Sequence, residues 1–344
     1  MEVLMQIKKI LVIQTAFLGD AILTLPMIQK LKQNNPSALI DVISIPNTAE
    51  LFEASECVNE VIILDKRGKH KSLFQLYKFI KDIKQKKYDE IYSPHRSFRS
   101  SLIVMLSGVR ETYGFNNSSI FHVYRNIIEY NINDHEVKRN LSLVGFDSEM
   151  DWKILPQINV KEEIRTKIKN LINEKDLNPS FVAIAPGSVW STKRYPLEHY
   201  EKIIQELISK KIKVVLIGGS DDRSLCDQLK ETDKNIISFA GELKIIESVE
   251  LLRSASLLIT NDSAPTHMGM AADVPVLTLY CSTIPQFGFY PYNNNSKYLS
   301  FDELDCKPCG IHGYEVCPLK HFNCGNMLKH DFILSTVYKM LNRS

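Results

Sequence analysis

The stretch Ile259-Thr260-Asn261-Asp262-Ser263-Ala264-Pro265-Thr266-His267 follows the hydrophobic residues 255–258 and leads into the small residues 268–272. Its pattern is that of an apolar strand that ends in a short polar turn, after which a helix begins. An α/β protein presents a helix N-terminus to an anionic ligand in this way, and Asp262 or Ser263 can cap such a helix. The backbone amides of the first helical turn are then available to phosphate oxygens. A capped turn that binds nothing is an equally good interpretation of this stretch alone.

Strand-like and helix-like segments alternate along the whole chain, and the alternation restarts in the second half. In the first half we expect strands over 9–14, 39–45, 61–64 and 88–92 and helices over 21–33 and 73–84. In the second half we expect strands over 181–185, 213–217, 257–260 and 274–280 and helices over 197–210, 222–230 and from about Ser263. Such alternation predicts parallel sheets with helices on both faces. The restart predicts two domains, at 1–175 and 176–344, joined at the charged helix 160–175 and the polar loop 176–180.

The composition excludes several classes of protein. The net charge is 42 − 40 = +2, which is too small to indicate nucleic acid as the main partner. No apolar stretch reaches the roughly 18 residues that a membrane-spanning helix needs. Residues 1–9 lack the apolar region of a signal peptide, so we expect a cytoplasmic protein whose thiols stay reduced.

The first candidate loop, residues 15–20, connects the first predicted strand to the first predicted helix. Gly19 permits a tight turn or a close backbone approach, and Asp20 lies where the helix dipole keeps a carboxylate charged. A carboxylate there can accept a proton from an incoming hydroxyl. The alternative is that Asp20 only caps the helix. The loop is neither a Gly-x-Gly-x-x-Gly fingerprint nor a P-loop.

A second candidate loop, residues 185–196, follows the first strand of the second half. Gly187 and Ser188 offer backbone amides, and Lys193 and Arg194 add positive charge. A lysine here can neutralise a diphosphate leaving group, because charge builds on that group as its bond breaks. The alternative is an ordinary solvated basic loop. In a weaker candidate, residues 218–222, Asp221 could bind ribose hydroxyls or only cap a helix.

Taken together, these segments resemble glycosyltransferase family 9, the ADP-heptose:lipopolysaccharide heptosyltransferases, and most closely the heptosyltransferase II branch. Their order and spacing match across nearly the whole chain. The residues that carry the resemblance are Leu18-Gly19-Asp20 with Thr24-Leu25-Pro26, Pro186-Gly187-Ser188 with Lys193-Arg194-Tyr195-Pro196, and Thr260-Asn261-Asp262-Ser263 with His267.

The resemblance implies a GT-B fold, in which two Rossmann-like domains face a central cleft. The acceptor would bind the N-terminal domain and the nucleotide sugar the C-terminal domain. Asp20 would be the base and Lys193 the residue that binds the diphosphate, which makes these two the predicted catalytic residues. The other predicted donor-binding residues are Gly187, Ser188, Asp221, Asp262, Ser263, Ala264 and His267.

The reaction implied by the family is an inverting transfer of heptose from ADP-L-glycero-D-manno-heptose to the inner core of lipopolysaccharide. No metal or cofactor is needed for catalysis if Lys193 and the helix amides offset the diphosphate charge. The alternatives are a GT-B transferase that uses a UDP-linked sugar, a UDP-sugar epimerase on the same scaffold, or a nucleotide-binding protein without catalysis.

A basic run follows the third predicted strand, and further cations follow the fourth. The resemblance implies that these residues grip the anionic inner core of the acceptor, whereas a solvated basic loop is the ordinary interpretation. Lysines at 78, 81, 84, 86 and 87 form a face that either is solvated or rests against the inner membrane surface. The predicted acceptor-binding residues are Lys66, Arg67, Lys69, Arg96 and Arg99, with His95 near them.

The cysteines are unevenly spread. Cys57, Cys226 and Cys281 are isolated, and we expect them to be buried as small hydrophobic residues. A second group, Cys306, Cys309, Cys317 and Cys324, lies within segment 306–324 and contains one Cys-x-x-Cys pair. This group is either a structural zinc site or a set of reduced thiols. In both cases the segment could order the loop beside the nucleotide site.

Overall fold

The computed structural model describes residues 7–146 and 151–342. The chain divides into two compact units, Met1–Asn159 and Val160–Ser344. The division falls at the start of the predicted joining segment, because helix α6 (Glu162–Glu174) packs within the second unit against α9 (Ile245–Leu252). An ion pair of 2.7 Å between Lys167 Nζ and Glu247 Oε1 joins these two helices.

The first unit contains a parallel sheet of six strands in the order β3-β2-β1-β4-β5-β6. The strands are β1 (Lys9–Ile13), β2 (Leu39–Ser44), β3 (Glu60–Ile63), β4 (Glu90–Ser93), β5 (Glu111–Phe115) and β6 (Asn126–Ile128). The continuous apolar run of β1 is fully buried from Ile10 to Ile13, as a central parallel strand requires. The strand order reverses between β1 and β4. Ligands of open α/β sheets bind beyond the carboxyl ends of the strands at such a point.

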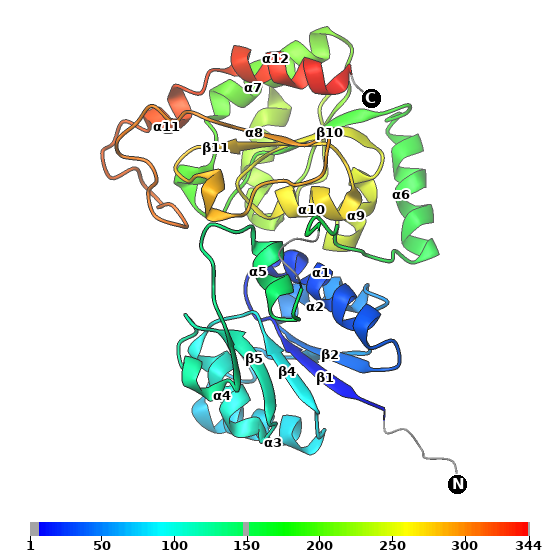
Figure 1. The fold of residues 1–344 in the computed structure, drawn as a ribbon. Coiled ribbons are helices and arrows are strands. Elements are labelled where there is room, and N and C mark those ends of the chain that lie inside the picture. The colour runs from blue at the N-terminus through cyan, green and yellow to red at the C-terminus, as the bar shows by residue number, and fades with distance from the viewer. Residues whose placement is uncertain (1–6, 147–150, 343–344) are drawn as a thin grey trace. The chain divides into compact units, whose positions relative to one another are not determined.

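Helices cover both faces of this sheet (Figure 1). One face carries α3 (Leu73–Gln85) and α4 (Phe98–Ser107), and the other carries α1 (Leu18–Asn34), α2 (Pro46–Glu53) and α5 (Glu136–Ser142). A short 3₁₀ helix, η1 (Phe121–Val123), contacts α4. Four apolar residues of α3, Leu76, Phe79, Ile80 and Ile83, pack in the core as their helical spacing predicts.

The second unit repeats the same plan, with the strand order β12-β11-β10-β7-β8-β9 and parallel pairing throughout. The strands are β7 (Phe181–Ala185), β8 (Val214–Leu216), β9 (Ile237–Ser238), β10 (Ala255–Asn261), β11 (Val276–Tyr280) and β12 (Lys297–Ser300). In this sheet the order reverses between β7 and β10. The predicted class, α/β with two Rossmann-like parallel sheets, is confirmed.

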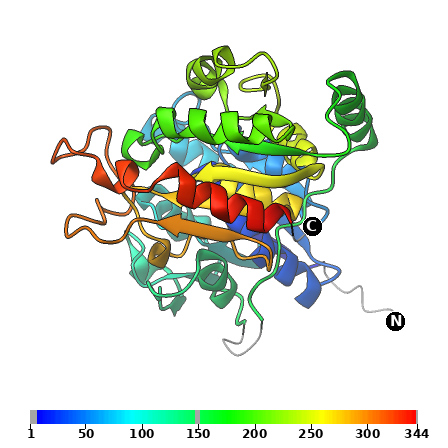
Figure 2. The same ribbon diagram turned by 90° about the horizontal axis from the view of Figure 1, so that it is seen from above.

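In the second unit α7 (Leu197–Ser209) and α12 (His330–Leu341) lie side by side on one face of the sheet (Figure 2). The other face carries α9 and α10 (Ala264–Ala272). The shorter elements are α8 (Arg223–Glu231), α11 (Asn323–Asn326), η2 (Ser191–Lys193), η3 (Ser220–Asp222) and η4 (Pro285–Phe287). Tyr200 and Ile203 of α7 pack with Ile333 and Val337 of α12 in one hydrophobic core.

Within the described ranges no helix combines the length and the apolar character that crossing a membrane requires. Residues 1–6, on which the expectation about the N-terminus partly rests, lie outside the described residues.

Candidate active site

Asp20 lies in the first turn of α1, directly beyond the carboxyl end of β1. The helix begins at Leu18 with Phe17 as its N-cap residue, so Asp20 is the third helical residue and not the N-cap residue. Gly19 is inside α1 and not in the tight turn that the sequence suggested. The half-buried Asp20 carboxylate therefore sits where the amides of the first turn favour negative charge.

Three hydrogen bonds brace the loop that leads to Asp20. Gln14 Nε2 donates to Thr24 Oγ1 over 2.7 Å, and Thr24 Oγ1 donates to the Asp20 carbonyl oxygen over 2.8 Å. Gln14 Oε1 also accepts a hydrogen bond from the Ala16 amide. Both Gln14 and Thr24 are buried, so the backbone at Asp20 is held from inside the unit.

Lys66 and His95 come from different loops and meet at Thr15. Lys66 Nζ donates to the Thr15 carbonyl oxygen over 2.7 Å, and the Thr15 hydroxyl hydrogen-bonds with His95 Nδ1 over 2.8 Å. Burial, and then the nearby Lys66 and Arg96 charges, lower the pKa of His95 to about 3, so its ring is neutral at pH 7. Burial, and then the Arg99 charge, lower the pKa of Lys66 to about 8. The loops after β1, β3 and β4 therefore converge at one edge of the sheet.

The basic loop after β3 is ordered by a carboxylate. Asp65 accepts hydrogen bonds from the amides of Gly68 (2.8 Å), Lys69 (3.1 Å) and Arg67 (3.2 Å). These amides, that of Gly68 first, lower the pKa of the Asp65 carboxyl. Arg67 and Lys69 are exposed, while Lys66 is half-buried beside Thr15. Of the predicted acceptor-binding residues in this loop, Lys66 therefore lies against Thr15, whereas Arg67 and Lys69 are exposed to solvent.

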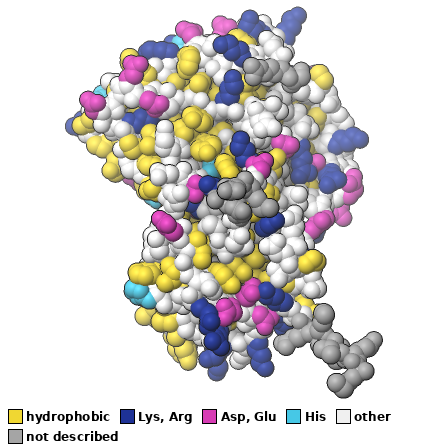
Figure 3. All heavy atoms as spheres, viewed as in Figure 1, with side chains coloured by type: hydrophobic (Ala, Val, Ile, Leu, Met, Phe, Trp, Pro, Cys, Tyr) yellow, Lys and Arg dark blue, Asp and Glu magenta, His cyan; other side chains and the backbone are white. Residues whose placement is uncertain are grey.

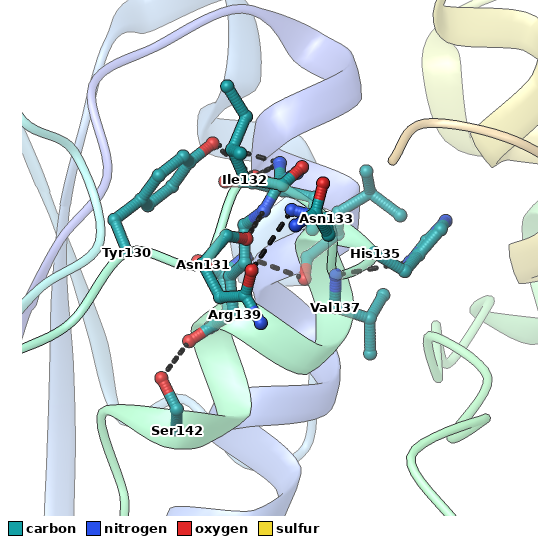
Figure 4. A network of polar contacts seen from close by, with 11 residues as sticks. Tyr130, Asn131, Ile132, Asn133, His135, Val137, Arg139 and Ser142 are labelled. Atoms are coloured by element: carbon teal, nitrogen blue, oxygen red, sulfur yellow. Dashed lines mark hydrogen bonds and ion pairs between the residues drawn. The ribbon is translucent and has the colours of Figure 1, made fainter. Parts of the chain in front are cut away.

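Arg96 is positioned by an aromatic ring that sequence reasoning missed. Its guanidinium lies over the Tyr130 ring, 4.0 Å from the centroid. Tyr130 is held in turn by Arg139, whose Nη1 donates to the Tyr130 hydroxyl and to Glu136 Oε2, both over 2.9 Å. Figure 4 shows Arg139 at the centre of this network, where it also donates to backbone carbonyls of Asn131 and Ile132. Such stacking fixes the plane of a guanidinium and leaves its N–H groups directed away from the ring.

In the second unit, Asn261 ties the loop after β7 to the loop after β10. Its Nδ2 donates to the Pro186 carbonyl oxygen over 2.7 Å, and its Oδ1 accepts from the Tyr195 amide and the Tyr200 hydroxyl. Ser263 Oγ donates to the Gly187 carbonyl oxygen over 3.4 Å. The loop 185–196 and the polar turn at 261–263 are thus joined at the reversal point of this sheet.

Lys193 and Asp262 form an ion pair of 2.6 Å between Nζ and Oδ2, and both side chains are nearly buried. Thr283, which follows β11, donates to the same Asp262 oxygen over 2.7 Å. The Asp262 carboxylate therefore anchors Lys193. It does not cap α10, although the sequence allowed that role. Separating the two side chains would leave a nearly buried charge without its partner, which is energetically unfavourable. The pair therefore holds the Lys193 ammonium at a fixed place.

The first turn of α10 has no side-chain cap. Ser263 is the N-cap residue, but its hydroxyl makes no capping hydrogen bond, and Ser263 and Ala264 are half-exposed. His267, on the same helix, is 4% exposed, and its Nδ1 makes no hydrogen bond with any part of the chain that the structure describes. Burial, and then the Lys193 charge, lower its pKa to about 3. Amides, a lysine and an unsatisfied imidazole nitrogen thus lie at one helix terminus, an arrangement suited to a phosphate-bearing ligand.

The two aspartates after β8, Asp221 and Asp222, have different surroundings. Asp222 Oδ2 accepts from the Gly219 amide over 2.9 Å, and a Cβ added to Gly187 would collide with the Asp222 carboxylate. Asp221, the predicted ribose ligand, is exposed. Ser188 is buried, and its carbonyl oxygen accepts from Arg194 Nε over 2.7 Å. Gly187 is therefore required for the close approach of these loops.

The cysteine-rich segment packs against the Lys193 turn. Thr192 Oγ1 donates to the Tyr314 carbonyl oxygen (2.9 Å) and accepts from the Tyr314 amide (2.8 Å). The Cys309 amide donates to the Ser282 carbonyl oxygen over 2.8 Å. No signal in the sequence pointed to Thr192 or Tyr314, because their contact spans a long stretch of chain.

The cysteines themselves are all free thiols. Cys226 and Cys281 are fully buried as expected, whereas Cys57 is only half-buried. Cys306 Sγ lies 4.0 Å from His321 Nε2. Within residues 7–146 and 151–342, no three His, Cys, Asp or Glu side chains are grouped so as to hold a metal ion. Structural zinc at Cys306, Cys309, Cys317 and Cys324 stays a prediction.

Solved structures share this fold. A family 9 glycosyl transferase from Veillonella parvula DSM 2008 superposes with a TM-score of 0.87 at 22% identity, covering 98% of each chain. The Escherichia coli ADP-heptose heptosyltransferase II superposes with a TM-score of 0.79 at 21% identity, covering 97% of this chain and 99% of that one. These likenesses define the class of fold, which is that of the GT-B glycosyltransferases.

Sequence similarity places the chain in a narrower class than the fold does. The sequence model of glycosyltransferase family 9 (heptosyltransferase) matches residues 76–316. The chain belongs to this family and is a glycosyltransferase. Lipopolysaccharide heptosyltransferase 2 of Escherichia coli (strain K12) is 24% identical over 298 residues, which cover 81% of this chain and 84% of that protein.

Proposed function

We propose that this transferase moves heptose from ADP-L-glycero-D-manno-heptose to the inner core of lipopolysaccharide. The observation that carries the donor half is the Lys193–Asp262 pair beside the uncapped first turn of α10 and the unsatisfied His267 nitrogen. These groups suit a diphosphate, and the similar Escherichia coli protein is named for ADP-heptose. Ser263 and Ala264 would supply amides, and Gly187 and Ser188 would line the same loop.

The chemistry is a displacement with inversion at the anomeric carbon of the donor sugar. Asp20 accepts the proton of the acceptor hydroxyl, and the hydroxyl oxygen forms the new bond to the anomeric carbon. The bond between that carbon and the phosphate oxygen breaks on the opposite face, and ADP leaves with the electron pair. Lys193 and the α10 amides offset the charge that builds on the leaving diphosphate.

The acceptor half rests on the cations at the carboxyl edge of the first sheet. Lys66, Arg96 and Arg99 form none of the ion pairs found among the described residues. Cations without a carboxylate partner suit an anionic acceptor, and stacking on Tyr130 presents Arg96 in a fixed orientation. Arg67 and Lys69 add charge on the outer side of the same loop.

The test is a transfer assay with ADP-heptose and heptose-deficient lipopolysaccharide. Asp20→Asn should lower kcat by roughly 10²–10⁴-fold, because it removes the base, and should leave donor affinity unchanged. Asp82→Asn, an exposed carboxylate on α3, is the matched control and should keep wild-type turnover. Strong activity of Asp20→Asn would refute the role of Asp20.

Nucleotide preference tests the donor separately. Stabilisation of the purified protein by ADP and not by UDP supports the ADP-linked sugar. A ligand at a hundred times its Kd raises stability by about 2.7 kcal/mol, which a thermal melt detects. A preference for UDP would favour instead a UDP-linked sugar or an epimerase on the same fold.

A further inference from the structure

The exposed end of α3 combines apolar and basic side chains. Leu73 is 76% exposed, Phe74 is 78% exposed and Tyr77 is 61% exposed, although all three lie in the first two turns of the helix. The core-facing positions of α3 are already filled by other apolar residues. These three side chains are therefore additional to what the fold of this unit requires.

The segment that contains this helix has a large excess of positive over negative charge. Residues 66–87 contain nine Lys or Arg residues and one acidic residue, Asp82, which gives 9 − 1 = +8, whereas the whole chain carries +2. At the lower edge of Figure 3, where Figure 1 labels α3, Lys and Arg side chains lie beside hydrophobic ones, with Asp and Glu side chains next to them. The rest of the chain therefore carries 2 − 8 = −6, and the excess of positive charge that attracts anions lies in this segment.

Helical spacing places the two kinds of side chain on one outward face. Leu73 and Tyr77 are four residues apart, as are Tyr77 and Lys81, and so are Phe74 and Lys78. Lys78 and Lys81 are exposed. The apolar residues thus form the tip of the helix and the lysines continue from it along the same surface.

The helix tip is rigid and is extended by α4. Ser72 caps α3 through a capping box with Gln75, in which each side chain bonds to the other residue's backbone amide. Arg99 Nη2 donates to the Lys71 carbonyl oxygen over 3.4 Å, which places the first turn of α4 beside this cap. Phe98, in that turn, is 56% exposed and adds a fourth apolar side chain.

We propose that Leu73, Phe74, Tyr77 and Phe98, with Lys78 and Lys81, form a docking surface for an anionic phospholipid bilayer. Apolar side chains that enter the acyl boundary and lysines at the level of anionic headgroups are the two elements of reversible membrane binding. A nucleic acid duplex would use the charge but not the aliphatic and aromatic tip. The inference goes beyond the proposed transfer reaction and does not depend on it.

The experiment is co-sedimentation of the full-length protein with vesicles of phosphatidylcholine, alone or mixed with phosphatidylglycerol. The vesicles contain no glycan acceptor, so the result is independent of the transfer assay. Binding should require phosphatidylglycerol and weaken with added salt. The double variant Leu73→Ser, Phe74→Ser should bind more than about tenfold more weakly. Both side chains are exposed to water in the free protein and would be removed from water only when the protein binds the bilayer.

Two matched controls make the result specific. Phe332→Ser, on an exposed residue of α12, should bind like wild type. Lys78→Gln with Lys81→Gln should weaken binding by roughly fivefold for each lysine, whereas Lys230→Gln with Lys234→Gln, two exposed lysines of the second unit, should have little effect.

Three outcomes would overturn the proposal. These are wild-type binding that phosphatidylglycerol does not increase, apolar variants that bind as tightly as wild type, and a wild-type dimer that the same apolar substitutions dissociate. The last would assign the surface to a second copy of this chain.

Discussion

The charge of the Lys66 side chain depends on pH within the range in which enzymes are assayed. Burial and the Arg99 charge lower its pKa from 10.5 to about 8, so the amine is protonated below that pH and neutral above it. If it attracts an anionic acceptor, the KM for the acceptor should rise as the pH increases through about 8, while the KM for the donor stays constant. Initial rates at saturating donor measure this directly.

Lys66→Arg is the control for that profile. Arginine stays charged throughout the range, so the acceptor KM of this variant should not change between neutral pH and pH 9 or so. A rise as steep as that of the wild type would show that another group titrates and would contradict the role of Lys66.

Arg139 is expected to be the main polar determinant of stability in the first unit. Its side chain is 1% exposed, it pairs with Glu136 over 2.9 Å, and it holds the Tyr130 hydroxyl. Arg139→Met leaves the buried Glu136 carboxylate without its cation and with only the Tyr130 hydroxyl of the two donors named here, which should lower the free energy of unfolding by about 3–5 kcal/mol. Urea denaturation followed by circular dichroism measures the loss.

A second pair of the same geometry supplies the control for this prediction. Arg253 and Glu250 are also three residues apart and 2.9 Å from each other, but the Arg253 side chain is 30% exposed. Arg253→Met should therefore cost much less, of the order of 1 kcal/mol. Equal losses for the two variants would show that burial of the Arg139 pair is not what stabilises the unit.

At the scale of elements, the cysteine-rich segment supports the η2 turn that carries Lys193. Gly313 has φ +77°, and a Cβ there would lie 2.8 Å from both Thr192 Oγ1 and Ser282 Oγ. Gly313→Ala should displace the turn and raise the KM for the donor. Gly310→Ala is the matched control, because Gly310 has φ +69° with nothing within 4 Å of the added Cβ. Both variants carry the backbone strain, so an equal effect would rule out the contact as its cause.

The elements that the sequence predicted well are those with a strong local pattern. The run Ile10–Ile13 and the polar turn at Asn261 located β1 and the start of α10 to within a residue or two. The sequence did not predict α5, whose residues are mostly polar and whose Asn140 Nδ2 bonds to the Leu23 carbonyl oxygen of α1. Tyr130 beneath Arg96 was missed for the same reason, since tertiary contacts and not local pattern place it.

At the scale of the whole molecule, one strand order used twice accounts for where the predicted residues lie. Asp20 and His95 follow the two strands that flank the reversal point in the first sheet, and Lys193 and Asp262 follow the corresponding strands in the second. The sequence predicted these positions from motifs that end strands. It could not predict that Asp262 would hold Lys193, because that contact depends on how two loops pack.

The positive groups at the donor site lead to a prediction about metal removal. Lys193 and the first-turn amides of α10 are placed to offset the diphosphate charge, so dialysis against EDTA should leave kcat within about twofold of its starting value. Lys193→Ala should lower kcat by roughly 10²–10³-fold, and added Mg²⁺ should not restore it. A tenfold loss on chelation that Mg²⁺ reverses would contradict this account. The same samples test for a structural metal, because chelation would then lower Tm and release zinc while kcat persists; Cys306, Cys309, Cys317 and Cys324 are its predicted ligands.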